Sequence, residues 1–344
     1  LDQLTGLRTI LSPARADRPF DFGGVPTLDD RQPADDCPFC EGREDRTPPE
    51  TWADRPPGGE ADTPGWRVRA VPNLYPALAQ AEELSAGMAG NESGVTAGGD
   101  PLRAATRGTE PDLFRASRAR GFHEVVIHSP RHRISVGELD DAELAAAVAG
   151  WRTRMRDHAE AAAYVQLIVN EGHEAGASLE HSHAQLYALG FVPAAIARER
   201  ERFASYNQHT MGGDLLAEIA SEEVRRRERL VAIDDEAVLI CPWASRSPFE
   251  LRLIPRNPRP SFERDEAGVA MLRTALRALD ARFERVPELN LWTITAPRGT
   301  DQFHWHLDIA PRIGIRAGFE MSTGVELNVF PPERAASELR EALS

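Results

Sequence analysis

The chain has 344 residues, of which 41% are hydrophobic and 27% are charged, enough for one large or two medium domains with their own cores. Its formal net charge of −14 argues against nonspecific binding to nucleic acid or to an anionic membrane, and favours a metabolite as the partner. All 40 basic residues are arginines, so functions that need a lysine P-loop, a kinase lysine or a Schiff-base cofactor are excluded.

The first half of the chain predicts strands and one long helix. Residues 29–66 are rich in proline, aspartate and glycine, which indicates an irregular or metal-organised region. Residues 79–118 hold few large apolar side chains, which predicts an exposed insertion. We predict a short apolar strand at 9–12, a strand from Trp66 to Asn73, a strand and turn over 123–132, and a buried strand over 164–170. Between the last two we predict a helix capped by Asp140 or Asp141, in which Leu144, Val148, Trp151 and Met155 stand at helical spacing.

The second half repeats this order. A strand and turn over 248–260 precede a helix with Leu272, Leu276, Leu279 and Phe283 at helical spacing, a strand over 289–295, and an H-x-H motif within 303–311. A repeated order with an H-x-H at the same place predicts an α+β fold of two tandem histidine-triad-like units, each a twisted, mostly antiparallel sheet with packed helices. We therefore expect domains at residues 1–190 and 191–344.

Two short motifs carry candidate chemistry. Cys37 and Cys40 form CPFC, which in a reducing compartment predicts half of a zinc site, with a pair of free thiols as the alternative. In the stretch 170–189 a glycine-rich loop precedes His181, His183 and Gln185, which would share one face of an extended chain. Free backbone N–H groups in such a loop suit an incoming phosphate, although a turn followed by a buried strand explains the same residues.

No apolar run in the sequence approaches the length of a membrane span, and residues 1–20 lack the apolar core of a secretory signal. We therefore expect a cytoplasmic protein.

The ordered set SPARADRP, CPFC, SPRH, N-x-G-x-x-x-G-x-S-x-x-H-x-H-x-Q and GFEM resembles the galactose-1-phosphate uridylyltransferase family of the histidine-triad superfamily. The matches cover most of the chain apart from the insertion, and their joint order is more specific than any one of them. Ser182 stands where uridylyltransferases usually carry proline, which is closer to the branch that contains ADP-glucose phosphorylase.

The resemblance implies a closed Cys2His2 site for structural zinc. Its ligands would be Cys37, Cys40, His132 and His181. It also implies that His183 is the nucleophile, since a neutral imidazole can attack the α-phosphorus of a nucleotide sugar and form a nucleotidyl-histidine intermediate.

The resemblance further assigns residues to the substrate. Gln185 and Ser178 would stabilise the transferred phosphoryl group. The other positions that match substrate contacts are Asn170 and Gly176 at the phosphate, Arg15, Arg18 and Asn73 near the nucleotide, and Phe319 and Glu320 near the sugar. Relatives commonly form homodimers that complete the active site across the interface.

The chain departs from the family in its second half. Glu199, His304 and His306 match three of four ligands of a second metal, but the loop over 295–303 offers no histidine for the fourth, so we expect that site to be lost or impaired. Gly314 also stands near the place of a family lysine.

The favoured function at this point is ping-pong uridylyl transfer between UDP-glucose and a hexose 1-phosphate. The alternatives are transfer of AMP from ADP-glucose to inorganic phosphate, hydrolysis of a nucleotide sugar, and nucleotide binding without turnover.

Overall fold

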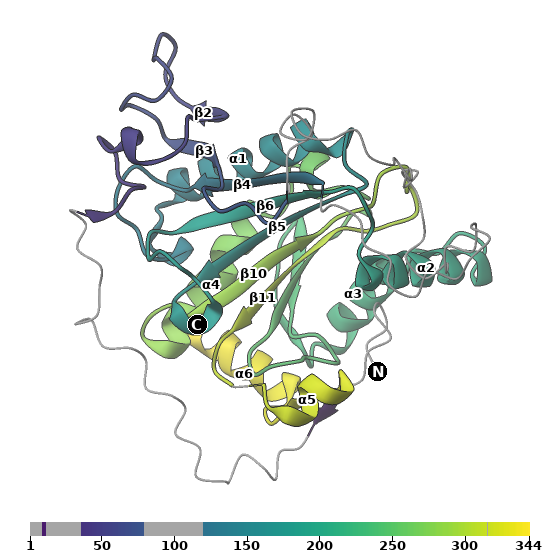
Figure 1. The fold of residues 1–344 in the computed structure, drawn as a ribbon. Coiled ribbons are helices and arrows are strands. Elements are labelled where there is room, and N and C mark those ends of the chain that lie inside the picture. Colours follow the sequence, from purple (N-terminus) through teal and green to yellow (C-terminus); the bar gives the residue numbers. More distant parts are fainter. Residues whose placement is uncertain (1–8, 12–35, 79–119, 315) are drawn as a thin grey trace.

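The computed structural model describes residues 9–11, 36–78, 120–314 and 316–344. Within these residues, ten strands form one antiparallel sheet in the order β2-β3-β4-β6-β5-β10-β11-β9-β8-β7 (Figure 1). The predicted α+β class is confirmed. The expected insertion at 79–118, and Arg15 and Arg18, lie outside the described residues.

Each half of the chain contributes five strands to this sheet, and each supplies a long helix, α1 or α4, that packs on it. The first half supplies β2 (Trp52–Asp54), β3 (Val68–Pro72), β4 (Gly121–Ile127), α1 (Asp141–Ala159), β5 (Tyr164–Glu171) and β6 (His183–Leu189). The second half supplies β7 (Leu230–Ile233), β8 (Ala237–Ile240), β9 (Leu251–Pro255), α4 (Val269–Phe283), β10 (Leu289–Ile294) and β11 (His306–Pro311).

The strand order 2-3-4-6-5 of the first half is repeated as 7-8-9-11-10 in the second, and the halves meet where β5 pairs with β10. The repeat predicted from the sequence is therefore visible as an internal pseudo-two-fold relation. Because both halves share one continuous sheet, their division into domains at residue 190 stays a prediction.

One face of the sheet is covered by α1, α4 and α6 (Pro332–Leu343), as Figure 1 shows. The α1 helix is capped by Asp140, whose side chain accepts from Glu143 N at 2.8 Å while the Glu143 carboxylate accepts from Asp140 N. This capping box satisfies N–H groups that the first turn would otherwise leave unpaired. The side chains predicted to face the core from this helix, Leu144, Val148, Trp151 and Met155, are all buried.

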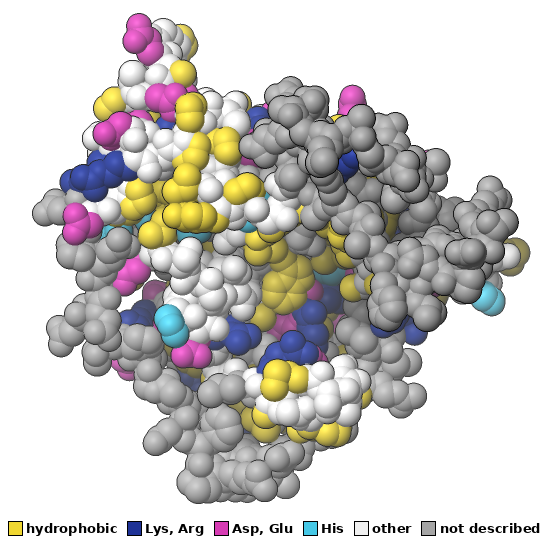
Figure 2. Space-filling view, viewed as in Figure 1, with side chains coloured by type: hydrophobic (Ala, Val, Ile, Leu, Met, Phe, Trp, Pro, Cys, Tyr) yellow, Lys and Arg dark blue, Asp and Glu magenta, His cyan; other side chains and the backbone are white. Residues whose placement is uncertain are grey.

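Among the described residues, the elements that pack on the opposite face lie towards its ends. Helices α2 (Ala194–His209) and α3 (Leu215–Arg226) pack there over the second half, and the segment around Cys37 and Phe39 packs over the first half. Figure 2 shows a hollow on this side with hydrophobic, basic and acidic side chains at its base. Helices α2 and α3 were not predicted from the sequence, and they have no counterpart among the described residues of the first half.

The remaining elements lie outside the large sheet. Strands β1 (Thr9–Leu11) and β12 (Glu326–Asn328) pair in parallel, and α5 (Gly318–Thr323) contacts β12. Short 3-10 turns are η4 (Glu44–Arg46), η6 (Val136–Glu138), η7 (His173–Ala175) and η8 (Phe262–Arg264). In the described part of the chain, no helix combines the length and the apolarity needed to cross a membrane.

Candidate functional site

Four side chains from three separate segments converge beside the start of β6. Two come from the CPFC turn, one from the turn after β4, and one from the residue pair before β6. The ligand atoms of Cys37, Cys40, His132 and His181 all lie within 4.8 Å of one another. Cys37 Sγ lies 3.4 Å from His181 Nδ1, and Cys40 Sγ lies 3.4 Å from His132 Nδ1.

These separations fit a tetrahedral ion. Zinc bonds of about 2.3 Å to sulfur and 2.0 Å to nitrogen place the two atoms roughly 3.5 Å apart. His181 Nε2 donates to Ser129 O at 2.9 Å, so Nδ1 carries the lone pair and faces the sulfurs. Burial lowers the pKa of His181 to about 4, and burial together with Cys37 raises the pKa of Cys40 to about 12. A bound cation would reverse the second effect by stabilising the thiolate. The residues can therefore hold a metal ion.

His183 is the first residue of β6 and does not belong to this group of ligands. Its Nδ1 donates to His181 O at 2.7 Å, which places the proton on Nδ1 and leaves the lone pair on Nε2. Phe39 packs edge-on against the ring at 5.3 Å between centroids, and the residue is 4% exposed. Burial lowers the pKa of His183, so the imidazole is neutral and nucleophilic near pH 7.

Gln185 lies two residues further along β6 in a polar network on the same face. Its Oε1 accepts from Tyr187 OH at 2.8 Å and lies 3.2 Å from His123 Nε2. Asn73 Nδ2 lies 3.1 Å from the same His123 nitrogen, and the rings of His123 and Tyr187 stack at 4.1 Å. Because the amide oxygen is engaged, the Gln185 NH2 group is the donor that a ligand would meet. His123 and Tyr187 were missed from the sequence, where strand alternation was the only signal.

The loop between β5 and β6 differs from the sequence-based expectation. Gly172 has φ 86°, and a Cβ atom there would lie 2.2 Å from the Glu288 side chain, so this position requires glycine. The amides of Ala175 and Ala177 donate to Gly172 O, and that of Gly176 donates to His173 O. The expectation of free backbone N–H groups is therefore wrong for these three residues, because the η7 turn uses them internally.

Asn170 is bonded to the second half of the chain. Asn290 of β10 donates from Nδ2 to Asn170 Oδ1 at 2.8 Å and to Ala175 O at 2.8 Å. The same amide group thereby fixes the Asn170 side chain and the loop. Asn290 was not predicted, because the contact depends on the pairing of β5 with β10.

The H-x-H motif of the second half has other partners. His304 Nδ1 lies 3.0 Å from Asp214 Oδ1, and His304 Nε2 donates to Pro255 O at 2.9 Å. His306 lies 3.6 Å from a carboxylate oxygen of Glu199 and 3.9 Å from one of Asp308. Among the described residues, only the four ligands beside β6 form a cluster suited to a metal ion.

The other predicted substrate residues lie in exposed or separate places. Ser178 and Gly176 are exposed on the loop before β6. Phe319 is 44% exposed in α5, and the Glu320 carboxylate accepts from Ala317 N at the start of that helix. Figure 1 shows α5 at the lower edge of the molecule, beside α6. The structure does not bring Phe319 or Glu320 into the hydrogen-bond network of Gln185.

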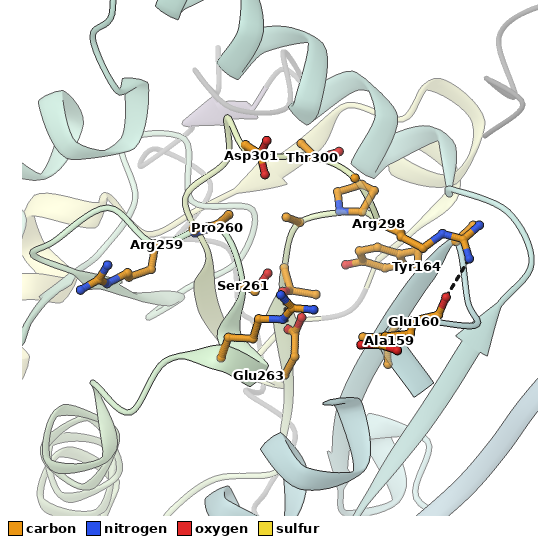
Figure 3. A pocket seen from close by; sticks show the side chains of 17 residues that line it. Ala159, Glu160, Tyr164, Arg259, Pro260, Ser261, Glu263, Arg298, Thr300 and Asp301 are labelled. Carbon is orange, nitrogen blue, oxygen red and sulfur yellow. Dashed lines mark hydrogen bonds between the residues drawn. The ribbon is translucent and has the colours of Figure 1, made fainter. Parts of the chain in front are cut away.

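Two cavities lie at pseudo-equivalent places in the two halves. One of about 950 Å³ is lined by the loop over 172–180, the turn at η6 and the helix α4. The other, of about 380 Å³, is lined by the loop over 295–301, the turn at η8 and the end of α1. Figure 3 shows the second one, where Arg298 donates to the Glu160 carbonyl at 2.8 Å.

Comparison with known proteins gives consistent matches. A family model described as "Galactose-1-phosphate uridyl transferase, N-terminal domain" matches residues 70–193. ADP-glucose phosphorylase of Arabidopsis thaliana is 30% identical over 355 residues, which cover 99% of this chain and 91% of the relative. Galactose-1-phosphate uridylyltransferase of Cryptococcus neoformans var. neoformans serotype D is 27% identical over 270 residues, 71% of each chain. A crystal structure of the A. thaliana ADP-glucose phosphorylase with bound ADP-glucose superposes with a TM-score of 0.76 at 27% identity, covering 99% of this chain and 97% of that one.

Proposed function

The chain belongs to the galactose-1-phosphate uridylyltransferase family of nucleotidyltransferases, and from this premise we propose that it transfers a nucleoside monophosphate from a nucleotide sugar through a covalent intermediate on His183. The observation that carries the proposal is the hydrogen bond from His183 Nδ1 to His181 O, which leaves Nε2 as the nucleophilic atom. The neutral ring needs no separate base, because its lone pair is already available.

In the first step the Nε2 lone pair forms a bond to the α-phosphorus, and the phosphorus–oxygen bond to the sugar 1-phosphate breaks. The electron pair leaves on the sugar phosphate, which is a weak base, so strong acid catalysis is unnecessary. In the second step an oxygen of the acceptor phosphate attacks the same phosphorus. The phosphorus–nitrogen bond then breaks, and its electron pair returns to Nε2.

The chain supplies neutral donors for the transferred phosphoryl group. The NH2 groups of Gln185 and Asn170 are presented by amides whose oxygens are already bonded, at 2.8 Å from Tyr187 OH and 2.8 Å from Asn290 Nδ2. Orienting such dipoles before the reaction lowers the cost of reorganisation in the transition state. Ser178 is assigned to the same group through its place in the family motif.

The four-residue metal cluster is assigned to structural zinc, which bound there would hold the CPFC turn against the start of β6. All four protein ligands are accounted for, as in closed structural sites. Phe39, which lies between the two cysteines, packs against His183, so the cluster also holds one wall of the nucleophile's surroundings.

The donor that we propose is ADP-glucose, with inorganic phosphate as the acceptor. Its support is the A. thaliana ADP-glucose phosphorylase, which matches nearly the whole chain, together with Ser182 of the HSH motif. The second candidate is UDP-glucose with a hexose 1-phosphate acceptor, which the uridyl transferase family model over residues 70–193 favours.

In the same proposal the protein acts as a homodimer in which α5 of one copy contributes side chains to the sugar-binding site of the other. The support is the exposed position of Phe319, 44% exposed, next to Glu320 in the family motif GFEM. Light scattering of the purified protein tests this, and a monomeric mass with full transfer activity contradicts it.

The experiment that tests the reaction is incubation with ADP-glucose and, separately, with UDP-glucose, followed by intact-protein mass measurement. We expect an AMP adduct from the first donor, released as ADP on addition of phosphate. A UMP adduct released by hexose 1-phosphate would support the second candidate. Free nucleoside monophosphate formed without any acceptor would indicate a hydrolase, and no adduct from either donor would contradict the covalent mechanism.

A further inference from the structure

A buried hydrogen-bond chain passes through Ser182, the residue between the two histidines of the H-x-H motif, and ends at Glu171. Trp151 Nε1 donates to His128 Nε2 at 3.0 Å, and His128 Nδ1 lies 2.9 Å from Ser182 Oγ. Ser182 Oγ in turn donates to Glu171 Oε1 at 2.7 Å. The four residues are at most 4% exposed, and they connect α1 to the end of β5 beneath the nucleophile's strand.

The direction of this chain follows from the chemistry of its members. An indole nitrogen can only donate, so His128 Nε2 must accept and the His128 proton sits on Nδ1. That nitrogen donates to the Ser182 hydroxyl, whose own proton is directed to Glu171. Burial lowers the pKa of His128 well below its ordinary value, so the ring stays neutral. Glu171 is therefore the terminal acceptor of the chain.

Glu171 is fixed by two further donors. Val136 N donates to its Oε1 at 2.6 Å, and Ser135 Oγ donates to its Oε2 at 2.8 Å. A carboxylate buried among uncharged donors is costly to desolvate, and the three hydrogen bonds offset part of that cost. They also leave the carboxylate with one orientation, in which it can hold the Ser182 hydroxyl.

Ser182 is bonded at its backbone as well as at its hydroxyl. Its N–H donates to Arg133 O at 2.6 Å, and the His181 carbonyl, which belongs to the same peptide group, accepts from His183 Nδ1 at 2.7 Å. Because a peptide group is planar, any rotation of Ser182 also moves the acceptor that holds the His183 ring.

We propose that Glu171, acting through Ser182, is a positioning residue that keeps the proton of His183 on Nδ1 and its lone pair on Nε2. The catalytic consequence rests on the proposed function, whereas the tautomer itself does not. Such outer partners commonly fix the tautomer and the orientation of a functional imidazole.

The second half of the chain shows that the fold does not require the hydrogen bond between Ser182 and Glu171. Trp305 N donates to Arg259 O at 2.9 Å, as Ser182 N does to Arg133 O, and Phe262 N donates to Thr295 Oγ1 as Val136 N does to Glu171. Trp305 stands at the position equivalent to Ser182, and Thr295 at the position equivalent to Glu171. The Trp305 indole donates to Asp265 instead. The backbone frame is thus common to both halves, while the Ser182–Glu171 link occurs beside His183.

The test compares Glu171→Gln and Ser182→Ala with the wild type and with the control Glu174→Gln. Glu174 lies three residues from Glu171 with its side chain 60% exposed, so the control removes a charge without touching the network. Imidazole 15N NMR, with the His183 signals assigned through a His183→Asn variant, reports which ring nitrogen carries the proton. Bound zinc, nucleotide-sugar affinity and single-turnover adduct formation are measured on the same samples.

We expect wild type and Glu174→Gln to show His183 protonated on Nδ1 alone, and Glu171→Gln and Ser182→Ala to show both tautomers. Adduct formation should fall about 10- to 100-fold in these two variants, with zinc content and affinity unchanged. A single Nδ1–H tautomer and a wild-type rate in both variants would overturn the proposal.

Two further outcomes of the experiment are distinguished from a failure of the proposal. If the wild type forms no adduct, the proposed function fails, and the NMR comparison still decides the positioning role. If Glu171→Gln loses its fold or its zinc, Ser182→Thr is compared with Ser182→Ala. Retention of the Nδ1–H tautomer by the threonine variant alone supports the hydroxyl link, and equal behaviour of the two variants contradicts it.

Discussion

The two halves of the molecule have the same backbone frame and different chemistry. In both, a histidine before the last strand donates from Nε2 to a backbone carbonyl at 2.9 Å, from His181 to Ser129 O and from His304 to Pro255 O. Both halves place a second histidine two residues later, at the start of the equivalent strands β6 and β11. The duplication has therefore preserved the geometry of the motif in both copies.

The difference lies in what faces each ring. In the first half His181 Nδ1 meets thiols and His183 meets a carbonyl, whereas in the second half His304 Nδ1 meets Asp214 and His306 lies near Glu199 and Asp308. Carboxylate oxygens lie 3.0 to 3.9 Å from the ring nitrogens of His304 and His306, and their negative charge disfavours the approach of a phosphate. Under the proposed function, the comparison teaches that a duplicated frame is expected to carry the reaction in one copy only, because the partners of the imidazoles differ.

The largest expected effect comes from replacing the second histidine of an H-x-H motif, either His183 or His306, with asparagine. His183→Asn should lower the rate of adduct formation by about four orders of magnitude or more, because it removes the proposed nucleophile. His306→Asn should leave the adduct on His183 at a rate within about tenfold of wild type. Intact mass and peptide mapping after incubation with the nucleotide sugar measure both, and an adduct mapped to His306 would break the comparison.

The next prediction compares the surroundings of His181 and His304, the first histidine of each H-x-H motif, by testing which of them faces a metal site. Cys37→Ser should abolish binding of one zinc per chain and cost several kcal/mol of folding free energy, which lowers Tm by roughly 10 °C or more. His304→Asn should keep the zinc, since Asp214 rather than thiols faces that ring. Elemental analysis together with calorimetry checks both variants. Zinc retained by Cys37→Ser would rule out the proposed ligand set.

A pH dependence of stability should arise from Glu171, where the second half has Thr295. Burial raises the pKa of Glu171 from 4.5 to about 7. The folded state therefore binds a proton that the unfolded state has lost, and stability falls as pH rises from about 4.5 to 7, by about 3 kcal/mol. Glu171→Gln should remove this slope. Denaturant unfolding at a series of pH values measures it, and parallel curves for wild type and variant would show that Glu171 does not titrate in this range.

The smallest expected effect concerns the side-chain amide of Asn290, one of the second-half groups that contact the loop before β6. Asn290→Ala should slow adduct formation about tenfold, because a lost hydrogen bond of about 1.4 kcal/mol leaves Asn170 and the loop less well oriented. The exposed Asn257 gives a control, Asn257→Ala, for which single-turnover rates should match the wild type. Equal rates for both variants would show that the hydrogen bonds of Asn290 do not contribute to the reaction.

The sequence by itself determined the repeat, the strand and helix series around it, and the residues of the H-x-H and CPFC motifs. These features are local or periodic: the buried positions Leu144 to Met155 of α1 follow helical spacing, and His183 and Gln185 follow the alternation of a strand. The resemblance to the family then ordered the motifs into one site.

Only the tertiary structure decided which groups hold those residues. Asn290 reaches Asn170 across 120 positions through the register of β5 and β10, and Glu171 reaches Ser182 because Ser182 directly precedes β6, the neighbour of β5. The same structure showed that the amides of Ala175 to Ala177 are consumed within their own turn. Hydrogen-bond partners are fixed by packing in space, and a linear pattern carries no record of them.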